Sequence, residues 1–320
     1  MSYTRAGSIE ALRTRARLLA RIRAFFAARG VLEVETPALS PAGVSDLALD
    51  SITATARSLG PTPLYLHTSP EYAMKRLLAG GSGDIYQICR VFRDDELGRW
   101  HQPEFTLLEW YRIGFDDTQL MDEVEALLRD ALADGGTSWR SERIGYSDAL
   151  ARSLGVDAGA SAASVAASLA ERGVDVPRGL THDALLDLAF ASIVVPSFAA
   201  DALTFVCDYP ASQAALARIK PGVPAVAARF EVFARGIELA NGFHELTDAA
   251  EQRRRFEKEI DARRRLGRHA PPLDEAFLDA LAHGLPDCAG VAVGVDRLVA
   301  LALGAESVAA AMAFVHRPRG

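Results

Sequence analysis

One stretch of the chain, from Cys89 to Arg112, combines charged and aromatic residues in a pattern that could do chemistry. The residues from Val91 to Arg93 indicate a strand, and a charged turn follows them. From Phe105 to Tyr111, successive side chains would point to opposite faces of a second strand. This alternation predicts a hairpin with Glu109 in the middle of an otherwise mainly apolar strand face. Because burying an unpaired carboxylate is costly, Glu109 requires either solvent at an edge hairpin or a cationic or donor partner. These residues alone leave both alternatives open.

Two further carboxylates, Glu231 and Glu238, lie in a second stretch of strand character at residues 229–246. A tight turn at residues 235–236 would pair Phe233 with Glu238 and place the two glutamates on the same face. Like charges this close disfavour each other unless one is protonated or a cation lies between them. A hard divalent ion such as Mg²⁺ would satisfy the pair, and two solvated glutamates on an exposed face are the alternative.

An arginine near the end of the chain also requires a partner. Residues 290–304 predict a buried strand, a break at Gly294, and a helix with Asp296 and Arg297 in its first turn. The helix dipole disfavours a cation at that end, so we expect Arg297 to face an anion or a carboxylate. The glycines do not form a dinucleotide fingerprint, because the context and spacing of that motif are missing.

The composition is ordinary for a soluble globular enzyme. The chain has 320 residues, 49% of them hydrophobic and 24% charged, and a net charge of −7. This acidic balance argues against a broad nucleic-acid-binding surface. No apolar run reaches the length of about 18 residues that a membrane span needs. The three cysteines lack metal-binding spacing, so we expect buried free thiols in a cytoplasmic protein.

Helix and strand signals along the chain indicate the elements that position these residues. Ser8 is a plausible cap for a helix at 9–29, and Ser69-Pro70-Glu71 opens a second helix that runs to Ala79. The arginine-rich start could be a transit segment, but its apolar spacing favours a surface or interface helix. We further expect helices at 118–133 and 248–265, and strands at 31–34, 49–54 and 64–67.

Residues 134–220 differ from the rest of the chain because they are rich in alanine and poor in candidate chemistry. Their apolar spacing predicts helices near 146–154, 161–172 and 182–193, and a strand at 203–207. We interpret residues 1–320 as a single catalytic domain, with a helical insertion at about 134–220 that packs on the main sheet.

Three of these stretches together resemble the signature motifs of class II aminoacyl-tRNA synthetases, and of lysyl-tRNA synthetases in particular. Phe92-Arg93 with the acids that follow and HQPEFT at 101–106 are similar to motif 2. GVDRL at 294–298 is similar to motif 3, and VETP at 34–37 is similar to the end of motif 1. The resemblance covers about residues 10–315 and is weakest at 134–220. Three motifs in the family's order are far more specific than any one of them.

The resemblance implies an α+β fold, the class II catalytic core, with a mainly antiparallel sheet flanked by helices. It also implies a homodimer joined partly through the first helix. The reaction it implies is activation of an amino-acid carboxylate by ATP, which gives an aminoacyl-adenylate and pyrophosphate. Glu231 and Glu238 match the family's Mg²⁺ ligands.

The resemblance also implies roles for individual residues. Arg93 would grip the α-phosphate, and Phe105 and Arg297 would sandwich the adenine. The residues that match ATP-binding positions are Arg93, Asp94, Asp95, Glu96, His101, Gln102, Phe105, Glu238, Leu239, Gly294 and Arg297. The residues that match the amino-acid pocket are Ser69, Glu71, Glu109, Tyr111, Asn241, Glu245 and Ala292. In this scheme Glu109 gains its cationic partner from the substrate amine.

Departures from the synthetases narrow the expected substrate. Motif 1 lies close to the first residue, so we expect no N-terminal OB domain for the anticodon, which argues against tRNA as acceptor. The stretches at 69–78, 237–249 and 290–306 are similar to the truncated lysyl-synthetase paralogues that ligate (R)-β-lysine to elongation factor P. Ala292 replaces a pocket glycine, and its methyl group would favour β-lysine over lysine by about 1–3 kcal/mol.

The sequence leaves open which acid of motif 2 binds ATP and which molecule accepts the activated amino acid. Asp95 stands where glutamate is usual and Glu96 follows it, so either acid could bind the ATP amino group. Gln102 replaces the usual asparagine but also offers an amide. The alternatives to a ligase for elongation factor P are a lysine-activating enzyme with tRNA or a small amine as acceptor, and a non-catalytic paralogue. A non-catalytic paralogue is expected to lose Arg93, the glutamate pair or Arg297, and all are present.

Overall fold

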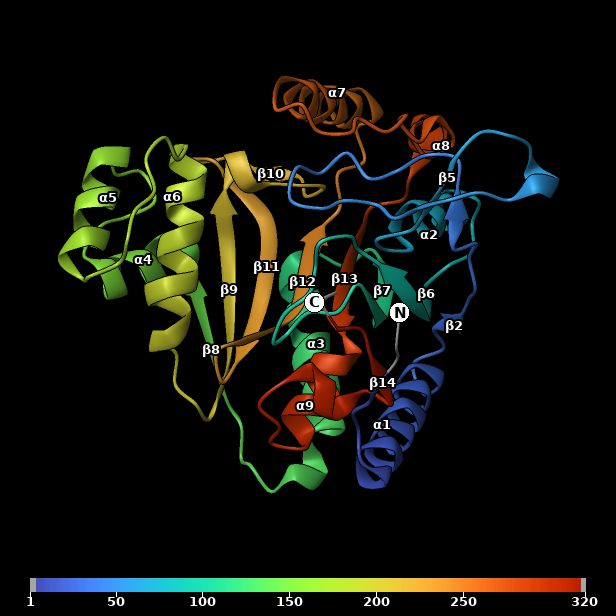
Figure 1. Ribbon diagram of the computed structural model, residues 1–320, viewed down its shortest axis with the longest axis horizontal. Helices are drawn as coiled ribbons and strands as arrows, with labels where there is room; N and C mark the ends of the chain where they lie inside the picture. Colours follow the sequence, from blue (N-terminus) through green and yellow to red (C-terminus); the bar gives the residue numbers. More distant parts are fainter. Residues whose placement is uncertain (1–3, 318–320) are drawn as a thin grey trace.

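A nine-stranded sheet organises the computed structural model, which describes residues 4–317 (Figure 1). Its strands are β2 (Leu32–Glu33), β6 (Ile85–Phe92), β7 (Glu104–Ile113), β8 (Arg140–Gly145), β9 (Ala202–Pro210), β10 (Ile219–Lys220), β11 (Val226–Ala234), β12 (Ile237–His244) and β13 (Cys288–Gly294). The order is β2-β6-β7-β13-β12-β11-β9-β8, with β10 paired to β11 off this path. Only β2–β6 and β8–β9 pair in parallel. The expected α+β class with a mainly antiparallel sheet is confirmed.

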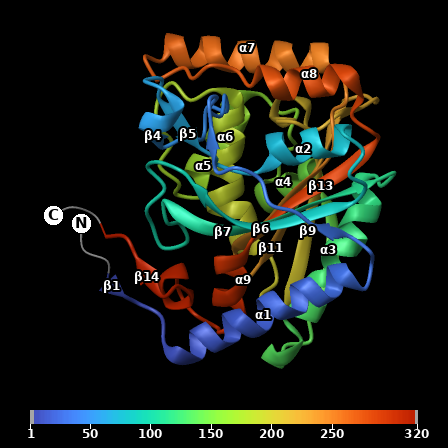
Figure 2. The ribbon, with the colours of Figure 1, turned by 90° about the vertical axis from the view of Figure 1, so that its right-hand side faces the viewer.

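One face of the sheet packs on helices α1 (Ile9–Ala27), α3 (Asp117–Ala131) and α9 (Val295–Ala302). Leu108 and Trp110 of β7 and Val291 of β13 point to this side and are fully or almost fully buried. Ser8 caps α1 by accepting a hydrogen bond from the Ala11 backbone N–H at 3.0 Å, as its sequence predicts. Figure 2 shows α1 below the sheet, with α7 and α8 on the opposite side.

The opposite face carries two separate groups of helices. Helices α2 (Glu71–Ala79), α7 (Ala249–Arg265) and α8 (Glu275–Gly284) pack together over the β6–β7–β13 side through an apolar cluster that includes Met74, Phe256 and Phe277. Helices α4 (Tyr146–Leu154), α5 (Ala162–Glu171) and α6 (His182–Ala189) lie beside β8 and β9 (Figure 1). The candidate active site lies on this face of the sheet.

The remaining elements are short. Strands β3 (Leu39–Ser40), β5 (Leu64–Leu66) and β4 (Thr53–Ala54) form a small sheet, and β1 (Thr4–Arg5) pairs with β14 (Phe314–Val315). Short 3₁₀ helices lie at Arg57–Leu59, Ala133–Gly135, Val195–Ser197, Ala211–Gln213 and Val308–Ala311, and α6 continues into a π-helical turn at Phe190–Val194. Within the part of the chain that the structure describes, no helix is both long and apolar enough to cross a membrane.

Most predicted helices and strands agree with the structure to within a few residues, but one strand prediction needs correction. The predicted strand at 49–54 is wrong except at its end, where β4 begins at Thr53. Helix α8 was not predicted. The segment at 134–220 is less separate than its composition indicates, because β8 and β9 extend the central sheet. All three cysteines are free thiols, and only Cys288 is buried, whereas Cys89 and Cys207 are half-buried.

Candidate active site

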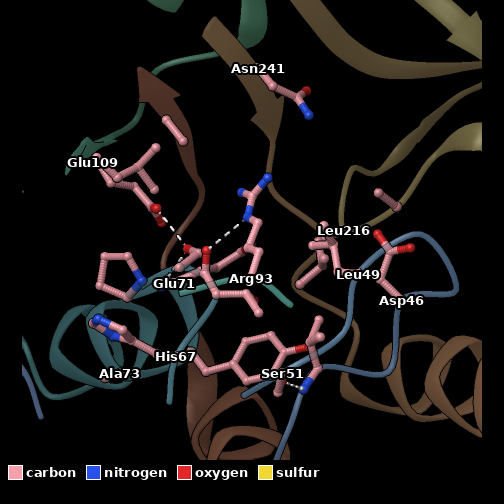
Figure 3. A pocket seen from close by; sticks show the side chains of 18 of the residues that line it. Asp46, Leu49, Ser51, His67, Glu71, Ala73, Arg93, Glu109, Leu216 and Asn241 are labelled. Atoms are coloured by element: carbon pink, nitrogen blue, oxygen red, sulfur yellow. Dashed lines mark hydrogen bonds between the residues drawn. The ribbon is translucent and has the colours of Figure 1, made fainter. Parts of the chain in front are cut away.

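A cavity of about 380 Å³ lies on the face of the sheet that is opposite to α1. Its floor is formed by β7, β13 and β12, and its walls by the start of α2, by residues 37–51, and by parts of α7 and of the segment that leads into α8. The side chains of Glu71, Arg93, Glu109 and Asn241 converge on this space (Figure 3). The alternation predicted for β7 is therefore correct, since Glu109 faces the cavity while Leu108 and Trp110 face the core.

The register of the sheet joins several predicted site residues into one row. Glu109 pairs with Ala292, Ala292 with Asn241, and Asn241 with Glu231. Paired residues of antiparallel strands project from the same face, so these four side chains form a row on one face of the sheet. The predicted pairing of Phe233 with Glu238 is also confirmed. A register shift next to this pair keeps Glu238 on the face of Glu231 and Asn241.

Strand β13 lies between the acids of β7 and β12 and borders the cavity with three small residues, Gly290, Ala292 and Gly294. Val291 also borders the cavity, but its side chain packs in the core. A Cβ atom added at Gly290 would lie 2.2 Å from the Tyr111 ring and 2.6 Å from Glu245 Oε1, so only glycine fits there. A Cβ added at Gly294 would meet the Arg297 side chain at an ordinary 3.5 Å. The strand thus forms a trough that is closed over by side chains at its Gly290 end and free at its Gly294 end.

Glu109 lies opposite Ala292, next to the closed end of this trough, and is 3% exposed, so the alternative of an edge hairpin with Glu109 in solvent is wrong. Its carboxylate accepts hydrogen bonds from the Ser69 hydroxyl at 2.7 Å and from the Tyr111 hydroxyl at 2.6 Å. Burial, with the nearby charge of Glu71 added, raises the pKa of Glu109 to about 7. Among the described residues, Glu109 has two neutral donors but no cation in direct contact, which leaves it able to bind a cationic ligand.

Two more carboxylates, Glu71 and Glu245, flank Glu109 and share a buried lysine. Lys75 Nζ lies 2.5 Å from Glu71 Oε1 and 2.5 Å from Glu245 Oε2, and its side chain is 1% exposed. Burial raises the pKa of Glu245, although Lys75 opposes the shift. Burial alone would lower the pKa of Lys75, but Glu245 and Glu71 raise it above its ordinary value. Lys75 therefore stays charged.

Unpaired oxygens at this end of the cavity mark positions for a ligand. Among residues 4–317, Glu245 Oε1 and the Asn241 side-chain oxygen find no hydrogen-bond partner although both are buried. Buried polar atoms without a partner are costly, so a bound donor is expected to complete them. Three carboxylates against one ammonium leave an excess of two negative charges when all are ionised. The amine end, as we call Glu71, Lys75, Glu109 and Glu245, suits a ligand with ammonium groups.

The opposite end of the trough carries two arginines from different elements. Arg93 follows β6, and its guanidinium lies 5.0 Å from the centre of the Phe105 ring and 3.5 Å from Glu96. Arg297 lies in the first turn of α9 and donates to the backbone oxygen of Glu238 at 2.9 Å, with the Glu238 carboxylate 3.4 Å away. The prediction that Arg297 faces a carboxylate is confirmed.

His101 completes this end by binding Arg297. The Arg297 guanidinium donates to His101 Nε2 at 2.7 Å. Burial and the neighbouring positive charge of Arg297 lower the pKa of His101, so the imidazole is neutral and accepts this hydrogen bond. Together Arg93, Phe105, His101 and Arg297 form what we call the nucleotide end, which combines positive charge with an aromatic face.

The acids of the motif 2 stretch lie in different places. Glu96 lines the cavity and contacts Arg93, whereas Asp94 and Asp95 are exposed and do not line it. Asp95 has a φ of 58°, in the left-handed region where the loop reverses direction. Gln102 is buried and accepts a hydrogen bond from the backbone N–H of His316 at 2.8 Å. This geometry favours Glu96 over Asp95 as the acid that faces a ligand.

The structure places nearly all predicted site residues around the cavity. All residues assigned to the amino-acid pocket line it, as do Arg93, Glu96, His101, Gln102, Phe105, Glu238, Leu239, Gly294 and Arg297. Glu231 does not line it, because its carboxylate is half-buried under Arg229, which donates to it at 2.5 Å. Lys75 and Arg229 were not predicted from the sequence.

Two carboxylates of this site have the chemistry to hold a divalent cation. Burial and the charge of Glu238 raise the pKa of Glu231, although Arg229 opposes the shift, so a cation near the pair would relieve a repulsion. Within residues 4–317 no group of three or more histidines, cysteines or acids is arranged to hold a metal by itself. The pair fits Mg²⁺, which commonly takes one or two carboxylates and completes its shell with phosphate oxygens and water.

Comparisons with known proteins agree with the resemblance found in the sequence. The family model described as tRNA synthetases class II (D, K and N) matches residues 1–318. Curated proteins named elongation factor P–(R)-β-lysine ligase, from Salmonella typhi and from Salmonella heidelberg strain SL476, are 49% identical to this chain over 319 residues. The matched region covers 97% of this chain and 96% of each relative.

Proposed function

Because the chain belongs to the class II tRNA synthetase family of the D, K and N group, we propose that it activates (R)-β-lysine with ATP and transfers the β-lysyl group to a lysine side chain of elongation factor P. The similarity to ligases of that name over nearly the whole chain supports the substrate and the acceptor. The observation that carries the proposal is the cavity itself, which joins a buried acidic end to an arginine end through a trough of small residues.

The two ends bind different parts of the reactants in this proposal. β-Lysine has two amines and one carboxylate, so the amine end binds its ammonium groups and the carboxylate points along the trough towards Arg93. Glu109 binds one ammonium directly, with its orientation fixed by Ser69 and Tyr111. Asn241 and Glu245 supply the acceptor oxygens that the described chain leaves without partners. Adenine lies between Phe105 and Arg297. To make room for it, Arg93 moves off the Phe105 ring and His101 gives up its hydrogen bond with Arg297.

The first step joins the carboxylate of β-lysine to the α-phosphorus of ATP. One carboxylate oxygen forms the new P–O bond, and the bond from this phosphorus to the bridging oxygen breaks, so pyrophosphate leaves. Arg93 stabilises the charge on the α-phosphate oxygens, for which a guanidinium is suited by its paired donors. Glu231 and Glu238 would hold Mg²⁺, which would supply positive charge to neutralise the phosphates. Glu96 faces the ATP amino group.

The second step transfers the acyl group from the adenylate to the acceptor protein. The neutral ε-amine of an acceptor lysine attacks the carbonyl carbon, an amide bond forms, AMP leaves, and the amine loses one proton. The acidic net charge of −7 is consistent with a protein acceptor and gives no general affinity for tRNA. We further propose a homodimer joined partly through α1, whose surface includes the half-exposed Ile9.

Exchange of labelled pyrophosphate into ATP tests this proposal directly. The purified protein is assayed with (R)-β-lysine, with lysine and with no amino acid, in the absence of tRNA. We expect strong exchange with β-lysine, weaker exchange with lysine and none without an amino acid. Exchange that favours lysine would assign the cavity to a different substrate. Absence of exchange with both would contradict adenylate formation and favour a paralogue that only binds.

A further inference from the structure

Lys75 is a fully buried cation beside the cavity, and the two reaction steps do not use it. It lies on α2 with 1% of its side chain exposed, between Glu71 at 2.5 Å and Glu245 at 2.5 Å. It does not line the cavity, although both of its carboxylate partners do. Lys75 therefore lies behind the acids and cannot contact a substrate except through them.

Buried ion pairs of this kind carry a large desolvation cost, so their retention calls for a reason. Apolar contacts are available around the lysine, since the rings of Tyr111 and Phe277 lie 5.9 and 6.0 Å from its Nζ. A methionine or leucine could fill the same space at less cost. The charge itself is thus the property that the site needs.

The count of charges at the amine end indicates what Lys75 does. Glu71, Glu109 and Glu245 would carry three negative charges close together, and Glu109 and Glu245 are almost fully buried. Three such carboxylates without a cation would bind protons instead of a ligand. With Lys75 present, the excess falls to two negative charges, the number that a substrate with two ammonium groups neutralises.

We propose that Lys75 is a positioning and specificity-determining residue, which holds Glu71 and Glu245 in place and sets the charge of the amine end to match a substrate with two ammonium groups. This inference rests on the proposed function, because the charge match has a purpose only if such a substrate enters the cavity. Lys75 acts through its two carboxylates and takes no part in the bond-forming steps.

The choice of lysine in this chain supports the inference. Only three of the 35 lysines and arginines are lysines. A compact ammonium can contact two carboxylates at once from one point, whereas a planar guanidinium needs more space and a fixed direction for its donors.

Among the described residues, the titratable groups around Lys75 are Glu71 of α2, Glu109 and Tyr111 of β7, Glu245 after β12 and Cys288 of β13, while α8 contributes the Phe277 ring.

The charge-removing variant Lys75→Met tests the inference in the full-length protein. We expect the KM for β-lysine at pH 7 to rise at least about 30-fold, the range for removing one partner of a buried charge pair, with a much smaller change in kcat. We also expect the pH at which KM reaches its minimum to rise by about one unit, because the remaining acids ionise less readily. Preference for β-lysine over 6-aminohexanoate, which has a single amine, should fall.

Lys220 offers a matched control outside the cavity. It also contacts two carboxylates, Asp117 at 2.5 Å and Asp208 at 2.9 Å, and it does not line the cavity. We expect Lys220→Met to lower the melting temperature at most, with the pH profile and the amine preference of the wild-type protein retained. A change of profile in Lys220→Met equal to that in Lys75→Met would show a general effect of instability and would overturn the inference.

A pair of variants keeps the test decisive if Lys75→Met does not fold. Glu245→Gln alone leaves Glu71 and Glu109 against Lys75, an excess of one negative charge. Adding Lys75→Met to Glu245→Gln restores an excess of two, so we expect the double variant to bind β-lysine more tightly than Glu245→Gln. A double variant that binds no better than Glu245→Gln would overturn the charge account. Wild-type protein without β-lysine-dependent exchange would instead overturn the proposed function, so the two failures are distinguishable.

Discussion

The two ends of the cavity are built in opposite ways. At the amine end, Glu109, Glu245 and Lys75 are between 1% and 3% exposed, and their contacts are short and internal. At the nucleotide end, Arg93 and Arg297 keep 24% and 19% of their side chains exposed. Two of their present partners, the half-buried Glu96 and the exposed His101, lie in the loop between β6 and β7.

This difference indicates that the two ends of the cavity have different functions. Buried charges in fixed geometry discriminate strongly between ligands. A ligand that leaves one of them unpaired binds more weakly by the full desolvation penalty of that charge. Arginines that pair with loop residues can exchange those partners for phosphates and adenine, which every reaction cycle requires. We therefore expect variants of the amine end to change substrate affinity and pH dependence, and variants of the nucleotide end to change the rate with all amino acids alike.

The largest effect is expected at the nucleotide end, for Arg93→Ala. Loss of the guanidinium removes the proposed donor to the α-phosphate, and removal of such a group costs about 10²–10³ in rate. Pyrophosphate exchange at saturating β-lysine should fall by this factor, with the KM for β-lysine nearly unchanged. Arg90→Ala is a suitable control, because Arg90 of β6 keeps 49% of its side chain exposed and contacts only Glu104 among the ion pairs of the described chain. If Arg93→Ala raised the KM for β-lysine and left the rate unchanged, the assignment of rate effects to the nucleotide end would be contradicted.

The next effect is expected at the amine end, for Gly290→Ala. The new methyl group would overlap the Tyr111 ring and displace Glu245, so we expect the KM for β-lysine to rise about 100-fold, as for the loss of a buried charge contact. Gly294→Ala is the matched variant on the same strand, where the methyl group has room. It should change the KM for β-lysine by less than about threefold, since a well-accommodated methyl group costs little. Equal effects of the two substitutions would show that the trough has no closed end.

A smaller effect is expected from pH, through Glu109. Its pKa of about 7 lies above the ordinary value of 4.5 because of burial and the charge of Glu71. Only the ionised form binds an ammonium group, so the KM for β-lysine should fall about tenfold between pH 6 and pH 8. Glu109→Gln should show a high KM with a weaker pH dependence, to which Glu245 still contributes because its pKa is also raised. A profile that is the same in the wild-type protein and in Glu109→Gln would assign the titration to another group.

The same shift predicts the pH dependence of stability in the free protein. A carboxyl group with a raised pKa contributes stability that is fully present below 4.5 and is lost as the pH rises through about 7. Thermal unfolding of the free protein should therefore show a decline over this window that is smaller in Glu109→Gln, where Glu245 still contributes. The stabilisation by added β-lysine should grow over the same window, because the ligand binds the ionised carboxylate.

The smallest effect is expected for Ala292→Gly, in the middle of the trough. Ala292 pairs with both Glu109 and Asn241, so its methyl group lies between two residues that we propose bind the substrate. Removing one methyl group should raise exchange with lysine relative to β-lysine by about fivefold, the value of one methylene in a pocket. An unchanged ratio would show that Ala292 does not determine the preference between the two substrates.

The sequence predicted what depends on periodicity and on neighbours in the chain. The alternation of residues in β7 predicted that Glu109 faces away from the core. The turn at Arg235 predicted the pairing of Phe233 with Glu238, and Ser69-Pro70 predicted where α2 begins. Contacts between distant segments were not predictable. Helical spacing pairs Lys75 with Glu71, but nothing in the sequence indicates that Glu245 closes on the same ammonium.

Local pattern also failed where long-range pairing decides the structure. The strand predicted at 49–54 is replaced by a loop that Arg263 of α7 holds by hydrogen bonds to Asp50 and to the Leu49 backbone oxygen. The choice between Asp95 and Glu96 depended on a loop conformation with a positive φ at Asp95. Neither feature has a signal in the neighbouring residues.

The intact mass of elongation factor P tests most directly whether the enzyme activates β-lysine with ATP and transfers it to a lysine of that protein. The acceptor is incubated with the enzyme, ATP, Mg²⁺ and (R)-β-lysine, and Arg93→Ala enzyme serves as the control. We predict a gain equal to one β-lysyl group on the acceptor, dependent on ATP and absent with the variant. An unmodified acceptor, in a reaction where pyrophosphate exchange proceeds strongly, would contradict the account and show that the adenylate is made for another acceptor.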